Sequence, residues 1–438
     1  MKLDQKHTIL IGFAFLSICS FWQMYDNLIP LILTHTFHIS ETASGVVMAA
    51  DNVLALFLLP LFGGISDRCT SRLGRRKPFI LVGTLVSVTL MMLLPILSDS
   101  YRSAPAAGKL TAFIVILGML LISMGTYRSP AVALMPDVTP KPLRSKGNAV
   151  INLMGAIGSI LYLLTAKILY DSADANASFL PLFAVTGGCM LVALAILMLF
   201  VDEPKLVKKQ QEYALANPEP LTDEAEGPSG SLPKEVKRSL AFLLISISLW
   251  FIGYNGISTW FTVYAQKMWN MSVGKASMCL TIATGGAIVS YLPVGAVASR
   301  VGRRCTIQFG TILLSVSFLT AFLYTLAFDS FSPILYVLFL MVGVAWASIN
   351  VNSLPMVVEM CKGSEVGRFT GLYYTFSMAA QIVTPIVAGF LLQNLSYKAL
   401  FPYAALFVAS SVVTISFVKH GDSRITPKRG IEIFDTDD

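Results

Sequence analysis

Apolar stretches of about 20 residues recur along the whole chain, and no other feature restricts its fold as strongly. The composition is 55% hydrophobic and only 13% charged, far from that of a soluble globular protein. A helix of about 20 residues crosses roughly 30 Å of hydrocarbon, where no water is present to pair exposed backbone groups. We therefore predict an all-α integral membrane protein.

Twelve such stretches are predicted to form transmembrane helices, arranged in two pseudo-symmetric halves of six. Their approximate bounds are 8–35, 44–66, 79–97, 111–136, 148–170, 179–201, 239–266, 275–298, 307–328, 333–358, 369–392 and 399–418. The intervening stretch is polar and contains NPEP, GPSG and LPKE, which is typical of a linker. The predicted organisation is a six-helix half (1–201), a cytoplasmic linker (202–238), a second half (239–418) and a cytoplasmic tail (419–438).

A short basic loop indicates that one half is a copy of the other. The segment GGISDRCTSRLGRRKPFI, residues 63–80, has an echo in GAVASRVGRR, residues 295–304. Gly74 and Gly302 are 228 residues apart, and Trp22 and Trp250 keep the same offset. Such parallel repeats are typical of transporters.

The basic residues predict the orientation in the membrane. The odd-numbered loops contain few of the 32 Lys and Arg residues: Arg102, Lys109, Lys267, Lys275 and Lys398. The positive-inside rule therefore places both termini in the cytoplasm. We expect a monomeric, multi-pass protein of the cell (plasma) membrane in contact with lipid. Because the net charge of +7 is spread over alternate loops, we expect no nucleic-acid partner.

The sequence carries no signature of enzymatic chemistry. The six cysteines show no metal-ligand spacing, and the motifs HExxH, GxSxG and GxxxxGK[ST] are absent. We therefore expect no catalytic residues, no metal site and no cofactor.

Apart from Lys167, which lies near the outer end of its span and is expected to extend to the interface, three charged residues lie within predicted spans of the first half: Asp26, Asp51 and Arg128. Each costs about 2.5–3.5 kcal/mol to insert, so each calls for a reason. A carboxylate in an apolar cavity can load a proton on one side and release it on the other as its surroundings change. We interpret Asp26 and Asp51 as ion-coupling residues with Arg128 as their partner or as a donor to sugar hydroxyls. The alternative interpretation is a structural ion pair.

Neutral polar and aromatic residues at membrane depth are candidate substrate contacts. Aromatic faces bind the C–H surfaces of sugars, and amides and hydroxyls bind their OH groups. The alternative is that these residues pack one helix against another. The candidates are Asn27, Asn52, Trp250, Tyr254, Asn255, Trp346, Asn350, Tyr373 and Gln381.

The basic loop is a candidate cytoplasmic gate, with a simple positive-inside anchor as the alternative. Asp67 can cap the N-terminus of the span that begins near Arg368, and the arginines can pair with Asp137, Asp202, Glu203 or Glu359. Because Ser299 stands at the aspartate position of the second copy, the acidic part of this gate is expected to operate in the first half only. The predicted gate residues are Gly63, Asp67, Arg68, Gly74, Arg75, Arg76, Asp137, Glu359 and Arg368.

The loop resembles the signature between spans 2 and 3 of the major facilitator superfamily. Its longer form, SDRCTSRLGRRKPFI, resembles that of plant sucrose/proton symporters and their animal and bacterial relatives, as does the stretch from Pro130 to Asp137 and Asn148-Ala149. Those carriers place a proton-accepting aspartate where this chain has Leu121, and span 5 lacks their sugar-binding arginine. Asp51 instead resembles the span 2 carboxylates of melibiose-type sugar/cation symporters, which keeps Na⁺ open as the coupling ion.

The resemblance implies a major facilitator fold and proton-coupled import of a disaccharide or related glycoside by alternating access. The partners would be the sugar and H⁺, with Na⁺ as an alternative. Drug or metabolite efflux is a second alternative, although span 5 lacks the Gly-Pro pair of such antiporters.

Overall fold

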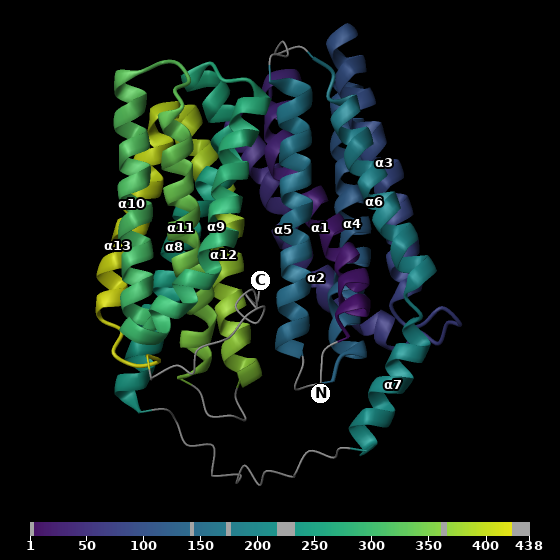
Figure 1. Cartoon of the computed structure of the whole chain (residues 1–438). Coiled ribbons are helices and arrows are strands. Elements are labelled where there is room, and N and C mark those ends of the chain that lie inside the picture. Colours follow the sequence, from purple (N-terminus) through teal and green to yellow (C-terminus); the bar gives the residue numbers. More distant parts are fainter. Residues whose placement is uncertain (1–3, 141–143, 172–176, 217–232, 361–365, 423–438) are drawn as a thin grey trace. The chain divides into compact units, whose positions relative to one another are not determined.

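The computed structural model describes the chain except for residues 1–3, 141–143, 172–176, 217–232, 361–365 and 423–438 (Figure 1). In the part that it describes, all regular structure is helical. Twelve helices within the described residues are long and apolar enough to cross a membrane. The prediction of an all-α protein with twelve spans is therefore confirmed.

Contacts divide the chain into two compact units. One consists of Met1–Asn217 with Met271–Met278, and the other of Pro218–Asn270 with Cys279–Asp438. The division between Asn217 and Pro218 falls inside the predicted linker, residues 202–238.

The described residues of the first unit form six long helices and one shorter helix. The long helices are α1 (Gln5–Leu31, extended by the π-helical turn Ile32–Thr36), α2 (Glu41–Asp67), α3 (Lys77–Ser103), α4 (Ala107–Val138), α5 (Arg144–Tyr170) and α6 (Leu180–Phe200). Helix α7 (Glu203–Ala216) follows directly, lies within the predicted linker and is polar (Figure 1).

The second unit repeats the pattern of six long helices. They are α8 (Lys234–Trp269), α9 (Val273–Val301), α10 (Arg303–Ala327), α11 (Ile334–Val358), α12 (Val366–Asn394) and α13 (Leu400–Ser416), with the 3₁₀ turn Tyr397–Ala399 before α13.

Local chemistry explains where several helices begin and end. The side chain of Ser40 accepts the backbone N–H of Ala43 at 3.3 Å and starts α2, with the acidic Glu41 in the first turn. Pro78 in the first turn of α3 sacrifices no helical hydrogen bond. Asn270 ends α8 in the left-handed conformation, at φ 46°. Polar residues between the apolar stretches thus set the helix boundaries.

Small residues allow α1 and α5 to pack closely. A Cβ atom on Gly158 would lie 2.1 Å from the backbone oxygen of Leu16, and one on Gly155 would lie 2.8 Å from the Sγ of Cys19. Without a hydrophobic drive between helices in lipid, close backbone approach of this kind is a main source of helix association.

Replacing Gly158 with Ala should therefore destabilise the first half, at a cost of about 1–3 kcal/mol from overpacking. Gly118→Ala is the matched control, because a Cβ at Gly118 meets nothing within 4 Å. Size-exclusion chromatography after heating the detergent-solubilised protein should show a lower apparent Tm for Gly158→Ala alone. Equal Tm values for the two variants would contradict the packing argument.

Candidate functional site

The structure brings together the three ionisable residues that the sequence places inside the first half. Asp26 comes from α1, Asp51 from α2 and Arg128 from α4. Asp26 interacts electrostatically with both Asp51 and Arg128, and Asp51 also interacts with Arg128. Among the residues that the structure describes, Arg128 makes no ion-pair contact within 4.0 Å. The cluster is therefore close enough for mutual attraction but is not a closed salt bridge.

Two members of the cluster, Asp51 and Arg128, each have a neutral neighbour that restricts their orientation. The Nδ2 of Asn52 donates to Asp51 Oδ1 at 2.8 Å. The guanidinium carbon of Arg128 lies 5.5 Å from the ring centroid of Trp22, a distance typical of a cation–π interaction. The charged groups are thus oriented by an amide and an indole.

Trp22 also belongs to this candidate site, although the sequence analysis identifies it only as a marker of the internal repeat. Its ring packs edge-on against Tyr25, with centroids 5.4 Å apart and an interplanar angle of 82°. The spacing of Trp22, Tyr25 and Asp26 is i, i+3, i+4, which puts all three on one face of α1. That spacing was the available signal.

In the second half, three of the predicted substrate contacts form one aromatic cluster. Tyr254 of α8 stacks on Trp346 of α11, with centroids 3.7 Å apart and an interplanar angle of 10°. Phe251 packs edge-on against Trp346 at 5.4 Å and against Tyr373 at 6.4 Å. The Tyr373 hydroxyl lies 3.2 Å from that of Ser353. Helices α8, α11 and α12 each contribute to this cluster.

The other predicted substrate contacts are more dispersed. Asn27 is buried and its Oδ1 accepts the Tyr162 hydroxyl at 3.3 Å, so its amide is directed toward α5. The Asn255 Nδ2 donates to the backbone oxygen of Phe251 at 2.9 Å. Trp250 and Asn350 are buried and Gln381 is half-buried. Their role in substrate binding stays a prediction.

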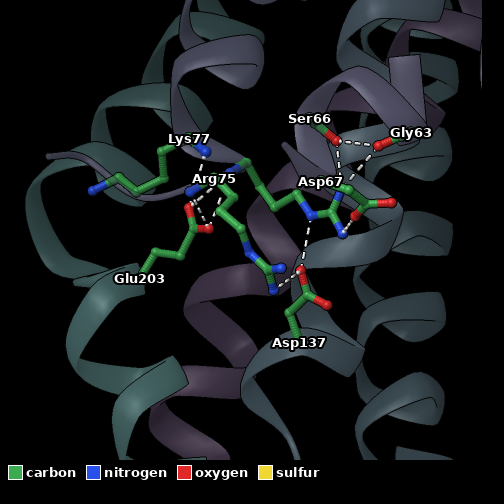
Figure 2. A network of polar contacts seen from close by, with 8 residues as sticks. Gly63, Ser66, Asp67, Arg75, Lys77, Asp137 and Glu203 are labelled. Atoms are coloured by element: carbon green, nitrogen blue, oxygen red, sulfur yellow. Dashed lines mark hydrogen bonds and ion pairs between the residues drawn. The ribbon is translucent and has the colours of Figure 1, made fainter. Parts of the chain in front are cut away.

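A second polar group of the first half lies at the basic loop. It is here called the loop network and consists of Arg75, Arg76 and Lys77 with their contacts Gly63, Ser66, Asp67, Asp137 and Glu203 (Figure 2). Gly74, at φ +110°, turns the chain so that three successive backbone N–H groups face the carboxylate of Glu203. The N···O distances are 2.7 Å from Arg75, 3.0 Å from Arg76 and 3.0 Å from Lys77. A Cβ on Gly74 would lie 2.3 Å from the Glu203 carboxyl carbon, so only glycine fits both the turn and the contact.

The buried side chain of Arg76 joins three helices. Its Nε donates to Asp137 Oδ2 at 2.8 Å, and its Nη atoms contact Asp67, Ser66 and the Gly63 oxygen. Burial lowers the pKa of Arg76, but the carboxylates of Asp137 and Asp67 outweigh burial and raise that pKa overall. Arg76 therefore stays charged at physiological pH and ties α2, α3 and α4 together.

A reciprocal contact connects α3 with α6. Glu203 accepts N–H groups at the positive N-terminus of α3, while the Nζ of Lys77 donates to the backbone oxygens of Met198 and Val201 at 3.1 and 2.6 Å. Each charge thus lies at the helix end whose dipole it complements.

These contacts show which of the acidic residues considered in the sequence analysis pair with the arginines of the loop. Asp137 is the partner of both Arg76 and Arg75, the latter at 3.4 Å. Glu203 binds the loop through its backbone, whereas Asp202 pairs with Lys205 at 2.9 Å. Arg68 and Arg368 are exposed, and capping of the helix near Arg368 by Asp67 stays a prediction.

The loop of the second half also has acidic partners, although Ser299 stands at the position that corresponds to Asp67. Gly302 turns the chain at φ +100°, and the backbone N–H of Arg303 donates to Asp422 Oδ1 at 2.6 Å. The side chain of Arg303 pairs with Glu359. Asp422 lies in the predicted tail, where it follows the last span of its half as Glu203 follows α6.

The chain matches the family model of the Major Facilitator Superfamily over residues 11–272 and 267–431. It therefore belongs to that superfamily, whose members are membrane transporters, and it is not an enzyme.

Known sugar carriers are among the relatives in sequence. The sucrose transport protein SUT3 of Oryza sativa subsp. indica is 27% identical over 215 residues, or 42% of this chain and 42% of that protein. SUC3 of Arabidopsis thaliana is 33% identical over 138 residues, or 29% and 23% of the two chains. The proton-associated sugar transporter A of Homo sapiens is 25% identical over 197 residues, or 41% and 26%. Each alignment spans less than half of the relative.

Solved transporters share the fold over almost the whole chain. The xylose transporter XylE from E. coli, in its inward open conformation, gives a TM-score of 0.66 at 14% identity and covers 95% of this chain and 96% of that one. The nucleoside transporter NupG gives a TM-score of 0.68 at 14% identity, with 95% and 100% covered. The predicted major facilitator fold is thus confirmed.

Replacing Glu203 with Gln should weaken the loop network. The amide of glutamine has one acceptor oxygen for the three N–H groups, and its NH₂ group faces another donor. We therefore expect the free energy of unfolding to fall by about 1.5–3 kcal/mol, the value typical of hydrogen bonds to a charged group. The readout is thermal unfolding in detergent, with the neighbouring exposed Asp202→Asn as control. A Tm for Glu203→Gln equal to that of the control would argue against this account.

Proposed function

We propose that this chain is a secondary active transporter that imports a disaccharide or related glycoside together with protons. The observation that carries the proposal is the cluster of Asp26, Asp51 and Arg128 inside the first half. The relatives that are named as sucrose transport proteins support a sugar as substrate, and the relative named as a proton-associated sugar transporter also supports proton coupling.

The geometry supports an exchange between a proton and the arginine. A carboxylate that loses its proton within the membrane needs a positive neighbour, and Arg128 interacts with both Asp26 and Asp51 without a fixed ion pair among the described residues. A protonated carboxyl group releases that attraction. The protonation state can therefore change how strongly α1, α2 and α4 are held together, which biases one transport state over another.

The aromatic cluster of the second half supplies the surface for the sugar. The Tyr254–Trp346 stack leaves one face of each ring directed away from the other, and a flat aromatic face suits the C–H side of a pyranose. In this proposal the charged cluster of the first half carries the coupling, and the aromatic cluster of the second half contributes neutral sugar contacts.

The loop network has the role of a cytoplasmic gate in this proposal, in a carrier of the plasma membrane with both termini inside. Its support is the concentration of basic residues in this loop, which the positive-inside rule assigns to the cytoplasm. Contacts that differ between the two transport states would set the rate of their exchange.

Uptake into proteoliposomes tests the coupling. Purified protein should accumulate labelled sucrose or maltose when an inward proton gradient is imposed, and an inward sodium gradient tests the alternative ion. Asp51→Asn, and to a smaller degree Asp26→Asn, should abolish accumulation but keep part of the sugar exchange without a gradient, because only the titratable group is lost.

Asp329→Asn is the matched control, because Asp329 is an exposed carboxylate between α10 and α11. Accumulation by both Asp51→Asn and Asp26→Asn at the control level would refute their assignment as coupling residues. Sodium-driven accumulation that is insensitive to pH would show that the coupling ion is sodium and not the proton.

Asp67→Asn tests the gate. This change weakens the ion pair with Arg76 at the loop but touches no group of the membrane cluster. We expect a lower maximal rate of sucrose exchange with KM changed less than twofold. Arg72→Gln, which removes an exposed charge of the same loop, should keep the wild-type rate. A change in KM alone for Asp67→Asn would rule out the gating role.

A further inference from the structure

Two buried hydrogen-bond donors on α1 have no partner among the residues that the structure describes. They are the indole Nε1–H of Trp22 and the hydroxyl of Tyr25, a residue that is only 1% exposed. Folded proteins pair nearly all buried donors, because an unpaired one carries the full cost of its lost hydration. Two such groups side by side therefore call for an external acceptor.

Both donors lie next to the charged cluster. Trp22 packs edge-on against Tyr25, and Tyr25 interacts electrostatically with Asp26 and Asp51. Arg128 covers one face of the indole at 5.5 Å. Arg128 thus holds the indole through one face of the ring, while its buried N–H group has no hydrogen-bond acceptor among the described residues.

The chemistry of the donors selects the kind of ligand. An indole nitrogen only donates, so neither H⁺ nor Na⁺ can satisfy it. A sugar hydroxyl can accept from Trp22 or Tyr25 and donate its own hydrogen to a carboxylate of Asp26 or Asp51. A neutral polyhydroxylated molecule therefore matches the whole group, whereas a cation matches the carboxylates alone.

The internal repeat provides an independent observation. Trp250, 228 residues after Trp22, is fully buried, and its Nε1–H has no partner within the described part of the chain. The equally buried indoles of Trp260 and Trp269 do have acceptors, the Pro385 oxygen at 3.3 Å and the Thr325 hydroxyl at 3.2 Å. Among the tryptophans that the structure describes, the pair at the repeat position thus has a buried N–H group without an acceptor in each half, each half considered by itself.

We propose that Trp22 and Tyr25 are substrate-binding residues of the first half, which donate hydrogen bonds to hydroxyl oxygens of the transported glycoside. This inference rests on the proposed function and adds a sugar contact within the cluster that carries the coupling charge. Because the hydroxyls bind beside the carboxylates, sugar occupancy and protonation act on the same residues.

The test is sucrose and maltose exchange in proteoliposomes without any ion gradient, so that coupling does not enter the measurement. Trp22→Phe and Tyr25→Phe each remove one donor and keep an aromatic ring. Loss of one neutral hydrogen bond should raise KM about three- to tenfold in each variant. In addition, a deoxy analogue that wild type binds more weakly than the parent sugar should lose that disadvantage in one of the two variants.

Trp260→Phe and Tyr127→Phe are matched controls, because each removes a donor that has a backbone acceptor, at 3.3 Å in Pro385 and 2.8 Å in Ala14. These controls should lower the Tm and keep the wild-type KM. A wild-type KM in both Trp22→Phe and Tyr25→Phe would overturn the inference while leaving the proposed function intact. If Trp22→Phe does not fold, the isosteric Tyr25→Phe decides alone. A wild-type protein that exchanges neither sugar would overturn the proposed function and this inference together.

Discussion

The cost of removing an ionised side chain from water governs where this chain keeps its charges. At the loop of the first half, Arg76 is buried but has two carboxylates and further acceptors around it. Within the membrane spans, Asp26 and Asp51 share one arginine that makes no ion pair with either among the described residues. The first arrangement compensates burial fully and is suited to holding helices together. The second leaves the charges incompletely compensated, which is suited to a group that must change its protonation state.

The features that follow from hydropathy and charge were predictable from the sequence. Apolar stretches indicated the twelve spans, and charges inside those stretches identified Asp26, Asp51 and Arg128 because so few such residues are tolerated in lipid. Pairing of the loop arginines with Asp137 was also among the expected contacts, since both lie at the same end of their helices.

Features that depend on the backbone path were not predictable in this way. Glu203 binds three backbone N–H groups, and their direction is set by the positive φ of Gly74. Asn27 follows Asp26 directly on α1. Its amide is nevertheless directed to Tyr162 of α5, because successive residues of a helix point about 100° apart. Trp22 became a site residue only when its contact with Arg128 was known.

The two halves reach the same arrangement at their loops with different residues. Glu203 and Asp422 both accept a backbone N–H just after a positive-φ glycine, and Asp137 and Glu359 both pair with an arginine of the loop. In the first copy Asp137 pairs with both Arg75 and Arg76, whereas in the second copy Glu359 pairs with Arg303, the counterpart of Arg75. The two halves therefore share an arrangement of charges around a turn. An alignment of their sequences alone underestimates this similarity.

Glu203 is at once the first residue of α7 and the residue whose carboxylate is fixed at the start of α3. The predicted linker is thus attached to the bundle at the first residue of α7. Its consequence is mechanical: tension that arrives along α7 acts on this anchor before it reaches the membrane-embedded part of α6. The length of the linker can then change during evolution without disturbing the helices to which the linker is joined.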